Sequence, residues 1–231
     1  MERAHLNKNI ILFSLVIQIL LFKNVTAQTV SPGPYYVQSG SVLFIKGSSN
    51  INSFVFKAGE VYGTGSLEAG YPSPVNSLND NKYSTTKVCV SILVKSLDSG
   101  NEKRNNDMYE AINAEEFPFI HYELIGGEVV KHPDKNLDWF YVHTKGELSI
   151  AGKTNTIEMN IQMRQLPDGR FNVKGSKSIL MTDYGIKPPT AFLGLIKADD
   201  RLEVHFNIIA APEVSASSLE KLLLYCKKKN F

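Results

Sequence analysis

The side chains best suited to catalysis or metal binding are scattered along this 231-residue chain. Four of its five histidines lie beyond residue 27, at His121, His132, His143 and His205. None stands at the short spacing from another histidine or a cysteine that a zinc site uses. The sequence also lacks the Gly-x-Ser-x-Gly nucleophile turn and the glycine-rich phosphate loop. We therefore expect a protein that is not an enzyme and that holds no metal or cofactor.

The acidic residues give no better candidate for catalysis. Glu115 and Glu116 are adjacent, and neighbours on an extended chain point apart, so they are poorly placed to share acid–base work. Asp183 precedes a Tyr-Gly pair, where an aspartate usually bonds its own backbone. Asp199 and Asp200 have no third oxygen ligand nearby in sequence, which makes calcium a weak alternative. An enzyme acting on a lipid or a sugar is the least favoured interpretation.

The segment Ser178–Lys197 is an apolar connection punctuated by glycine and proline, with Tyr184, Ile186, Phe192 and Leu193 along it. Connections are usually polar because they run over the surface. This one is expected to pack over something, either as a plug at one end of a barrel or as a cover on the mouth of a cavity.

The rest of the chain predicts an all-β fold. Thr156–Gln165 and Arg201–Ile209 alternate apolar and polar residues, and Lys87–Lys95 does so more loosely, as half-buried strands do. Further strands are expected at Ser41–Lys46, Phe54–Gly63, Phe119–Ile125, Leu137–Ile150 and Phe171–Leu180. Eight strands hide their edges by closing into an antiparallel barrel, whose interior is either filled or holds one small ligand. A two-sheet sandwich is the competing architecture.

Turns and helices complete the plan. Residues 151–153 and 166–169 carry hairpin signals, which predict an antiparallel meander from Leu137 to Leu180. One short helix is expected at Met108–Ala114 and a second at Ser217–Tyr225. The Ser- and Asn-rich stretch Thr64–Thr86 is expected to be a loop.

The first 27 residues are typical of a cleavable secretion signal. Arg3 and Lys8 precede the apolar run Ile10–Leu21, and Val25–Ala27 supplies small residues for cleavage. We expect a periplasmic or secreted protein, with an uncleaved anchor as the alternative. The full chain has 25 Lys and Arg against 23 Asp and Glu. The signal contains three of the bases and one of the acids, so the remainder is neutral and no nucleic-acid partner is expected.

Beyond the signal we expect one domain, residues 28–212, followed by a basic tail, residues 213–231. The tail ends in Lys227–Lys229 and could make transient contact with anionic lipid. Cys89 and Cys226 are the two cysteines, and whether they pair is left open.

Five motifs occur in an order that resembles the YceI-like family, across about residues 36–210. They are Ile45–Asn50, Val94–Gly100, Met108–Pro118, Gly146–Thr154 and Thr182–Pro189. The resemblance implies an eight-stranded antiparallel, lipocalin-like barrel, periplasmic or secreted, with one short helix. Some members hold polyisoprenoid or quinone-type lipids in an internal pore, and relatives are often dimeric, so a homodimer is an expectation here. The sequence differs from the family pattern at residues 50–54 and in the long 64–86 loop.

The predicted function is a non-enzymatic carrier or store for an isoprenoid lipid, such as a polyprenyl or quinone tail. The alternative is a stress-related interaction protein with a filled barrel that works through its loops and tail. Methionines suit a lipid pore because they adapt to irregular apolar shapes. The residues expected to contact the lipid are Phe54, Phe56, Val90, Ile92, Phe119, Val142, Ile157, Met159, Ile161, Met163, Tyr184, Ile186, Phe192, Val204 and Phe206.

Overall fold

The computed structural model describes residues 34–66, 87–131, 139–191 and 193–212. All of them belong to the compact unit Ser31–Phe231. The expected signal peptide, most of the 64–86 loop, the tail and Cys226 lie outside the described residues. Within those residues, no helix combines the length and apolar character needed to cross a bilayer.

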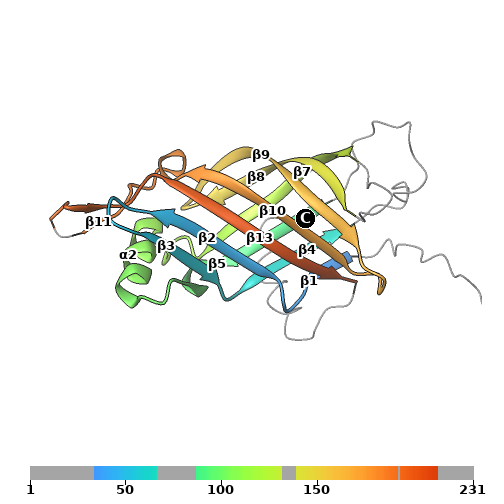
Figure 1. Ribbon diagram of the computed structural model, residues 1–231, viewed down its shortest axis with the longest axis horizontal. Coiled ribbons are helices and arrows are strands. Elements are labelled where there is room, and N and C mark those ends of the chain that lie inside the picture. Colours follow the sequence, from blue (N-terminus) through green and yellow to red (C-terminus); the bar gives the residue numbers. More distant parts are fainter. Residues whose placement is uncertain (1–33, 67–86, 132–138, 192, 213–231) are drawn as a thin grey trace, which may run out of the picture. The chain divides into compact units, whose positions relative to one another are not determined.

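Antiparallel strands close into a barrel (Figure 1). The ring closes because β13 pairs with β10 on one side and with both β1 and β2 on the other. Counting the interrupted pairs β1/β2 and β3/β4 as one strand each gives the eight strands that the sequence predicted. The closed ring rules out the two-sheet sandwich. Its strands are β1 (Pro34–Val37), β2 (Val42–Ser48), β3 (Ser53–Ala58), β4 (Val61–Ser66), β5 (Lys87–Leu93), β7 (Phe119–Lys131), β8 (Phe140–Ile150), β9 (Lys153–Gln165), β10 (Phe171–Leu180) and β13 (Arg201–Ala211).

The predicted strand Phe54–Gly63 is in fact two strands that meet at a corner. β3 pairs with β2 and with the short β6 (Leu97–Asp98), whereas β4 pairs with β1 and β5. The corner at Gly59 and Glu60 is held by Ser96, at the end of the 3-10 helix η1 (Val94–Ser96). The Gly59 amide donates to the Ser96 carbonyl oxygen at 2.9 Å, and the Glu60 amide donates to Ser96 Oγ at 3.0 Å.

Both hairpin turns predicted from the sequence are present. Ala151 and Gly152 join β8 to β9 with φ angles of 49° and 76°, the two positive values of a type I′ turn. Gly169, at φ 83°, closes the β9–β10 turn, where the Leu166 amide donates to the Arg170 carbonyl oxygen at 2.7 Å. The meander β8–β9–β10 is therefore confirmed.

The helix α2 (Glu102–Ile112) begins six residues earlier than predicted. Its N-cap is Asn101, whose side-chain oxygen accepts from the Arg104 amide at 2.9 Å, as capping residues do. The sequence pattern missed the start because the first two turns are polar and carry no apolar periodicity. The helix ends at Asn113, which takes a left-handed conformation.

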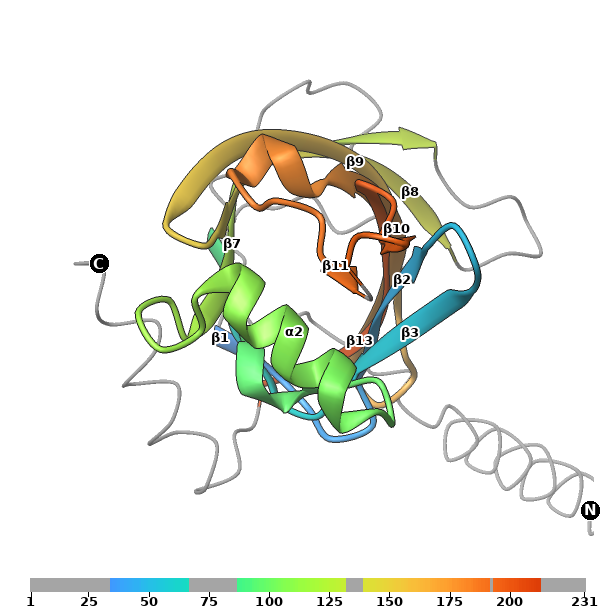
Figure 2. The same cartoon turned by 90° about the vertical axis from the view of Figure 1, so that its left-hand side faces the viewer.

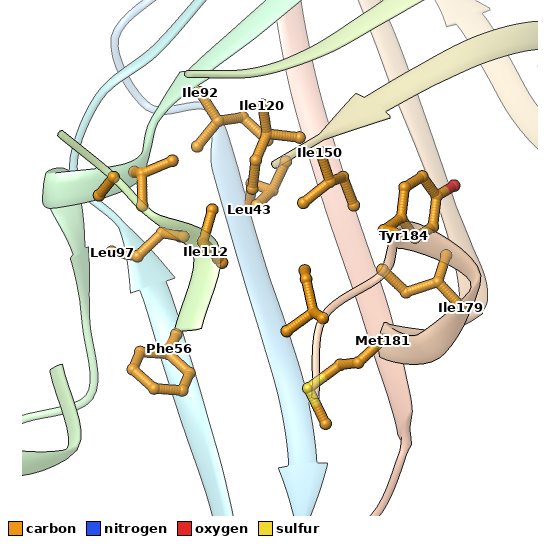
Figure 3. Packing of buried hydrophobic residues seen from close by; sticks show 13 residues of the cluster. Leu43, Phe56, Ile92, Leu97, Ile112, Ile120, Ile150, Ile179, Met181 and Tyr184 are labelled. Atoms are coloured by element: carbon orange, nitrogen blue, oxygen red, sulfur yellow. The ribbon is translucent and has the colours of Figure 1, made fainter. Parts of the chain in front are cut away.

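Helix α2 lies across one end of the barrel, and Figure 2 looks onto that end. On the opposite side of the same end, against β9 and β10, lies η2 (Met181–Tyr184), the first part of the predicted apolar crossing. Side chains from both point toward the strands in Figure 3, forming one packed cluster that we call the plug. The first part of the crossing, through Ile186, thus packs at the barrel end, as one of its two expected roles required. Leu193, farther along, was expected to pack as well but is fully exposed, because the chain leaves the barrel end after Ile186. The plug contains Leu43, Phe56, Ile92, Val94, Leu97, Ile112, Ala114, Ile120, Ile150, Ile179, Met181, Tyr184 and Ile186.

Candidate functional site

Strand register fixes which side chains face the barrel interior. Ile92 and Ile120 belong to the plug and are directly opposite each other on β5 and β7. Since side chains alternate along a strand, the register carries this inner face from strand to strand around the ring. On β9 it selects Ile157, Met159, Ile161 and Met163.

Most of the residues expected to contact lipid share this inner face. Tyr184 and Ile186 lie in the plug instead of on a barrel strand, Phe56 and Ile92 lie in the plug on β3 and β5, and Phe192 lies outside the described residues. The inward-facing members of the predicted set are Phe54, Phe56, Val90, Ile92, Val142, Ile157, Met159, Ile161, Met163, Val204 and Phe206.

Phe119 is the exception, because the structure places it on the outer face. Ile120 faces inward, so the alternation of β7 turns Phe119 and His121 outward, and their rings lie 5.8 Å apart. The sequence could not show this, since an aromatic residue at a strand end suits either face. Phe119 therefore does not join the other candidates.

The interior differs between its two halves. At the α2 end many inward residues belong to the plug and are almost wholly buried, as with Leu97 at 1% exposure, while others such as Val204 and Phe206 are partly buried against it. Farther along β9, Met159, Ile161 and Met163 also face inward but remain only half-buried. Phe140 and Val173, opposite Met163 on either side, are half-buried too, although the sequence did not single them out. Val142 and Thr144 on β8 are buried here, at 6% and 4% exposure, but most of the neighbouring inward side chains are not. This half of the interior is less tightly filled than the plug, and we call it the lumen.

Glycines on the inner wall leave room for aromatic rings to lie flat against it. A Cβ atom on Gly146 would fall 2.5–2.6 Å from the Tyr122 ring and hydroxyl, and one on Gly175 would fall 2.7 Å from the Phe206 ring. Real side chains do not approach so closely, so any larger residue would displace these rings. Both glycines occupy inward positions in the register.

Tyr122 brings a buried hydroxyl to the inner face. Among the described residues its oxygen has no hydrogen-bond partner. The Thr144 hydroxyl, which is close by, donates instead to the Met159 carbonyl oxygen at 2.9 Å. Burial raises the pKa of Tyr122. An unpaired buried hydroxyl is unusual and offers one polar contact to a molecule inside the barrel.

The barrel wall opens between β9 and β10. Their ladder runs from the Gln165–Phe171 pair only as far as Ile161 and Gly175. Beyond it, residues 153–160 of β9 and 176–180 of β10 do not pair with each other. A side pocket of about 700 Å³ occupies this gap, lined by residues of both strands and by Thr182, Asp183 and Tyr184 of η2.

Two lysines and two acids line this side pocket. Lys177 lies at an inward position and its Nζ donates to the Glu158 carbonyl oxygen at 2.7 Å, bridging the gap. Asn155 Nδ2 makes a second bridge, to the Asp183 carbonyl oxygen at 2.9 Å. Lys153 has no ion-pair partner among the described residues. Only these two hydrogen bonds, each from a side chain to a backbone carbonyl, are described across the gap. They hold β9 and β10 together much less firmly there than a continuous ladder of backbone hydrogen bonds would.

The residues considered for catalysis do not come together. His121 Nδ1 lies 2.9 Å from Ser91 Oγ on the outer wall, and His205 stacks on Phe44. Glu115 pairs with Lys95, whereas Glu116 accepts a hydrogen bond from Asn113. The described part of the chain holds no cluster of three or more metal-ligating side chains.

Asp200 makes a structural contact with Thr182. Its carboxylate accepts hydrogen bonds from the Thr182 amide at 2.9 Å and the Thr182 hydroxyl at 2.6 Å. These bonds hold the pKa of Asp200 below its usual value. They fasten the start of η2 to the start of β13.

Comparison with known proteins supports this architecture. The sequence matches the YceI-like domain over residues 46–210. The fold is similar to BcnA from Burkholderia cenocepacia, with 13% identity, a TM-score of 0.57, and coverage of 76% of this chain and 99% of that one. It is also similar to a polyisoprenoid binding domain from Saccharophagus degradans implicated in plant cell wall breakdown, with 14% identity, a TM-score of 0.55, and coverage of 76% and 97%.

No curated protein matches the sequence. The two structural likenesses, at such low identities, speak for the fold alone. The domain match is stronger evidence, since it spans more than half of the chain and covers nearly the whole barrel. The chain belongs to the YceI-like family.

Proposed function

We propose that this protein binds an isoprenoid-type lipid in the lumen and carries or stores it without catalysis. The observation that carries the proposal is the lumen itself, where inward apolar side chains such as Met159, Ile161 and Met163 remain half-buried. A fully packed interior would bury them, as the plug buries Leu97. The similar domain from Saccharophagus degradans is described as polyisoprenoid binding, which supports the same ligand class here.

The chemistry of the lumen suits such a chain. Branched apolar units gain roughly 25 cal/mol for each Å² removed from water, and thioethers adapt to their irregular outline. The unpaired Tyr122 hydroxyl supplies one hydrogen-bonding group along the path. The plug closes the lumen at the α2 end, so the length of the ligand is limited on that side.

The side pocket between β9 and β10 is the proposed place for a polar head group. Lys177 and Lys153 can donate to head-group oxygens there, and Asn155 can donate as well if it leaves the Asp183 carbonyl. An opening in the wall lets an apolar tail enter sideways while its head stays hydrated. The lysine and acid charges of the pocket balance, so its contribution is hydrogen bonding more than net charge.

The biological setting follows from the sequence alone. With its first 27 residues typical of a secretion signal, the protein is proposed to act in the periplasm or outside the cell. A homodimer stays a prediction. The alternative function, a filled barrel acting through its loops and tail, depends on residues 67–86 and 213–231, outside the described part.

A lumen-filling variant tests the proposal. Native mass spectrometry would follow one-to-one binding of geranylgeraniol to the delipidated chain from residue 28. Ile161→Trp places an indole inside the lumen and should weaken binding at least about tenfold, because the ring occupies space the ligand needs. Asn160→Trp places the same ring on the exposed outer face of β9 and should bind as the parent does.

Circular dichroism shows whether each variant keeps the barrel. Folded Ile161→Trp protein that binds as tightly as Asn160→Trp would contradict a lumen site. Absence of binding by the parent chain would favour the filled-barrel alternative.

A further inference from the structure

The three most exposed large apolar side chains among the described residues gather at one projection. Leu193 is fully exposed at 107%, Leu195 is 77% exposed and Ile51 is 62% exposed. The first two lie between β11 (Thr190–Ala191) and β12 (Ile196–Lys197). Figure 1 shows this hairpin extending past the barrel beside α2. We call Leu193, Leu195 and Ile51 the finger tip.

Hydrogen bonds brace the finger tip against the β2–β3 turn. Asn50 accepts from the Lys197 amide at 2.9 Å through its side-chain oxygen and donates to the Leu195 carbonyl oxygen at 2.8 Å through its side-chain nitrogen. Its own amide donates to the Lys197 carbonyl oxygen at 3.1 Å. Ile51 is the next residue, so this bracket holds it beside the hairpin. The apolar side chains are thus presented on a supported structure.

The backbone conformation at Leu193 is a further reason to assign a functional role to this exposed side chain. Its φ of 56° and the 89° of Gly194 are both positive. Bulky residues seldom adopt this region, which turns usually fill with Asn, Asp or Gly. A leucine there contributes nothing to the fold through burial, because it is fully exposed.

We propose that the finger tip inserts into the interface of a lipid bilayer and docks the α2 end of the barrel there. A stable protein interface buries about 1,200–2,000 Å² through 20–30 residues a side, whereas this tip offers three side chains on a narrow projection. Such a projection suits a fluid interface, where apolar groups sink among lipid chains. Exposed Lys187 and Lys197 flank it and suit the head-group layer.

Docking in this way brings the side pocket near the bilayer. The crossing that forms the hairpin begins at η2, whose Thr182, Asp183 and Tyr184 line that pocket. A lipid leaving the membrane would then reach the opening without crossing bulk water. Bilayer contact does not require a ligand in the lumen. The membrane-docking inference can therefore be wrong while the proposed lipid binding is right, and lipid binding can be wrong while membrane docking is right.

The test uses the chain from residue 28 with its tail intact. Leu195→Trp in a Trp139→Phe background leaves one tryptophan, since Trp139 is the only native one. Its fluorescence in phosphatidylcholine vesicles with brominated acyl chains should be strongly quenched. Ile125→Trp in the same background, on the exposed outer wall of β7, should not be quenched.

Vesicle co-sedimentation gives the second measurement. Leu193→Ser with Leu195→Ser should lower the partition coefficient about tenfold for each leucine lost from the apolar contact. Ile125→Ser with Val130→Ser, which removes two exposed apolar side chains elsewhere, should leave it unchanged. Geranylgeraniol binding should be the same in all of these variants.

Four results would overturn the inference. The first three are unquenched fluorescence from the Leu195→Trp variant, vesicle binding that survives the double leucine change, and vesicle binding confined to anionic phosphatidylglycerol, which would indicate the basic tail. Self-association of the parent chain that disappears in the double leucine variant, without vesicle binding, would show a protein partner instead and would also overturn it.

Discussion

Truncation of one side chain in each half of the interior distinguishes a packed core from a hollow one. Leu97 is 1% exposed and packs in the plug. Leu97→Ala should lower the free energy of unfolding by about 3–4 kcal/mol, because buried methyl groups are lost and a cavity remains. Met159 faces the lumen and is only half-buried, so Met159→Ala should cost about 1 kcal/mol, a fraction of full burial with no new closed cavity.

The assay is urea unfolding of the delipidated chain from residue 28, followed by circular dichroism. Geranylgeraniol at about 100 times its dissociation constant should then stabilise the parent by about 2.7 kcal/mol. Leu97→Ala should keep that gain, because it lies outside the lumen. Met159→Ala should lose part of it, because it removes ligand contacts. Leu97→Ala should therefore be the more damaging variant when stability is measured, and Met159→Ala the more damaging one when ligand binding is measured.

Equal costs for the two truncations in the absence of ligand would refute this reasoning. Such a result would mean that Met159 is packed as tightly as Leu97 and that the whole interior is a solid core. Unchanged ligand stabilisation in Met159→Ala would separately remove that residue from the binding surface.

Three further outcomes are expected. Tyr122→Phe should change stability at pH 7 by less than about 1 kcal/mol, because the lost hydroxyl has no partner. The raised Tyr122 pKa contributes stability that is full below about pH 10 and lost as the pH rises above it, so this variant should show a shallower alkaline decline in urea titrations; an equally steep decline would contradict it. Gly146→Ala should lower the free energy of unfolding by about 1–3 kcal/mol, because a Cβ atom displaces the Tyr122 ring. Gly127→Ala, whose Cβ atom would meet its nearest neighbours at 3.4 Å, should cost clearly less in the same urea titrations. Asn101→Ala should lower thermal stability by about 0.5–2 kcal/mol through loss of the cap on Arg104, and no change would show that the cap is dispensable.

The barrel was predictable because its half-buried strands leave a period-two trace. β9 and β13 alternate cleanly and lie close to their predicted bounds. β7 is longer than predicted, since a register shift between Leu124 and Gly126 breaks its alternation. The corner at Gly59 and Glu60 was invisible because apolar residues continue on both sides of it.

For the candidate site, the sequence predicted only which residues share one face of a strand. Alternation identified Met159 and Met163 as a set, but it could not say which strands pack in the plug and which line the lumen. The opening between β9 and β10 depends on where their ladder stops at Gly175, and Phe119 faces outward because of its pairing partners. The opening and the direction of Phe119 both depend on how strands distant in sequence pair, which the local sequence pattern does not encode.

The most direct test of the account is an experimental structure of the delipidated chain soaked with geranylgeraniol. A continuous chain of ligand density inside the barrel, against Met159 and Ile161 and reaching toward the side pocket at Lys177, is the result we predict. Ligand found only on the outer surface, or protein side chains filling the space beside Met159, would contradict the proposed lipid-binding lumen.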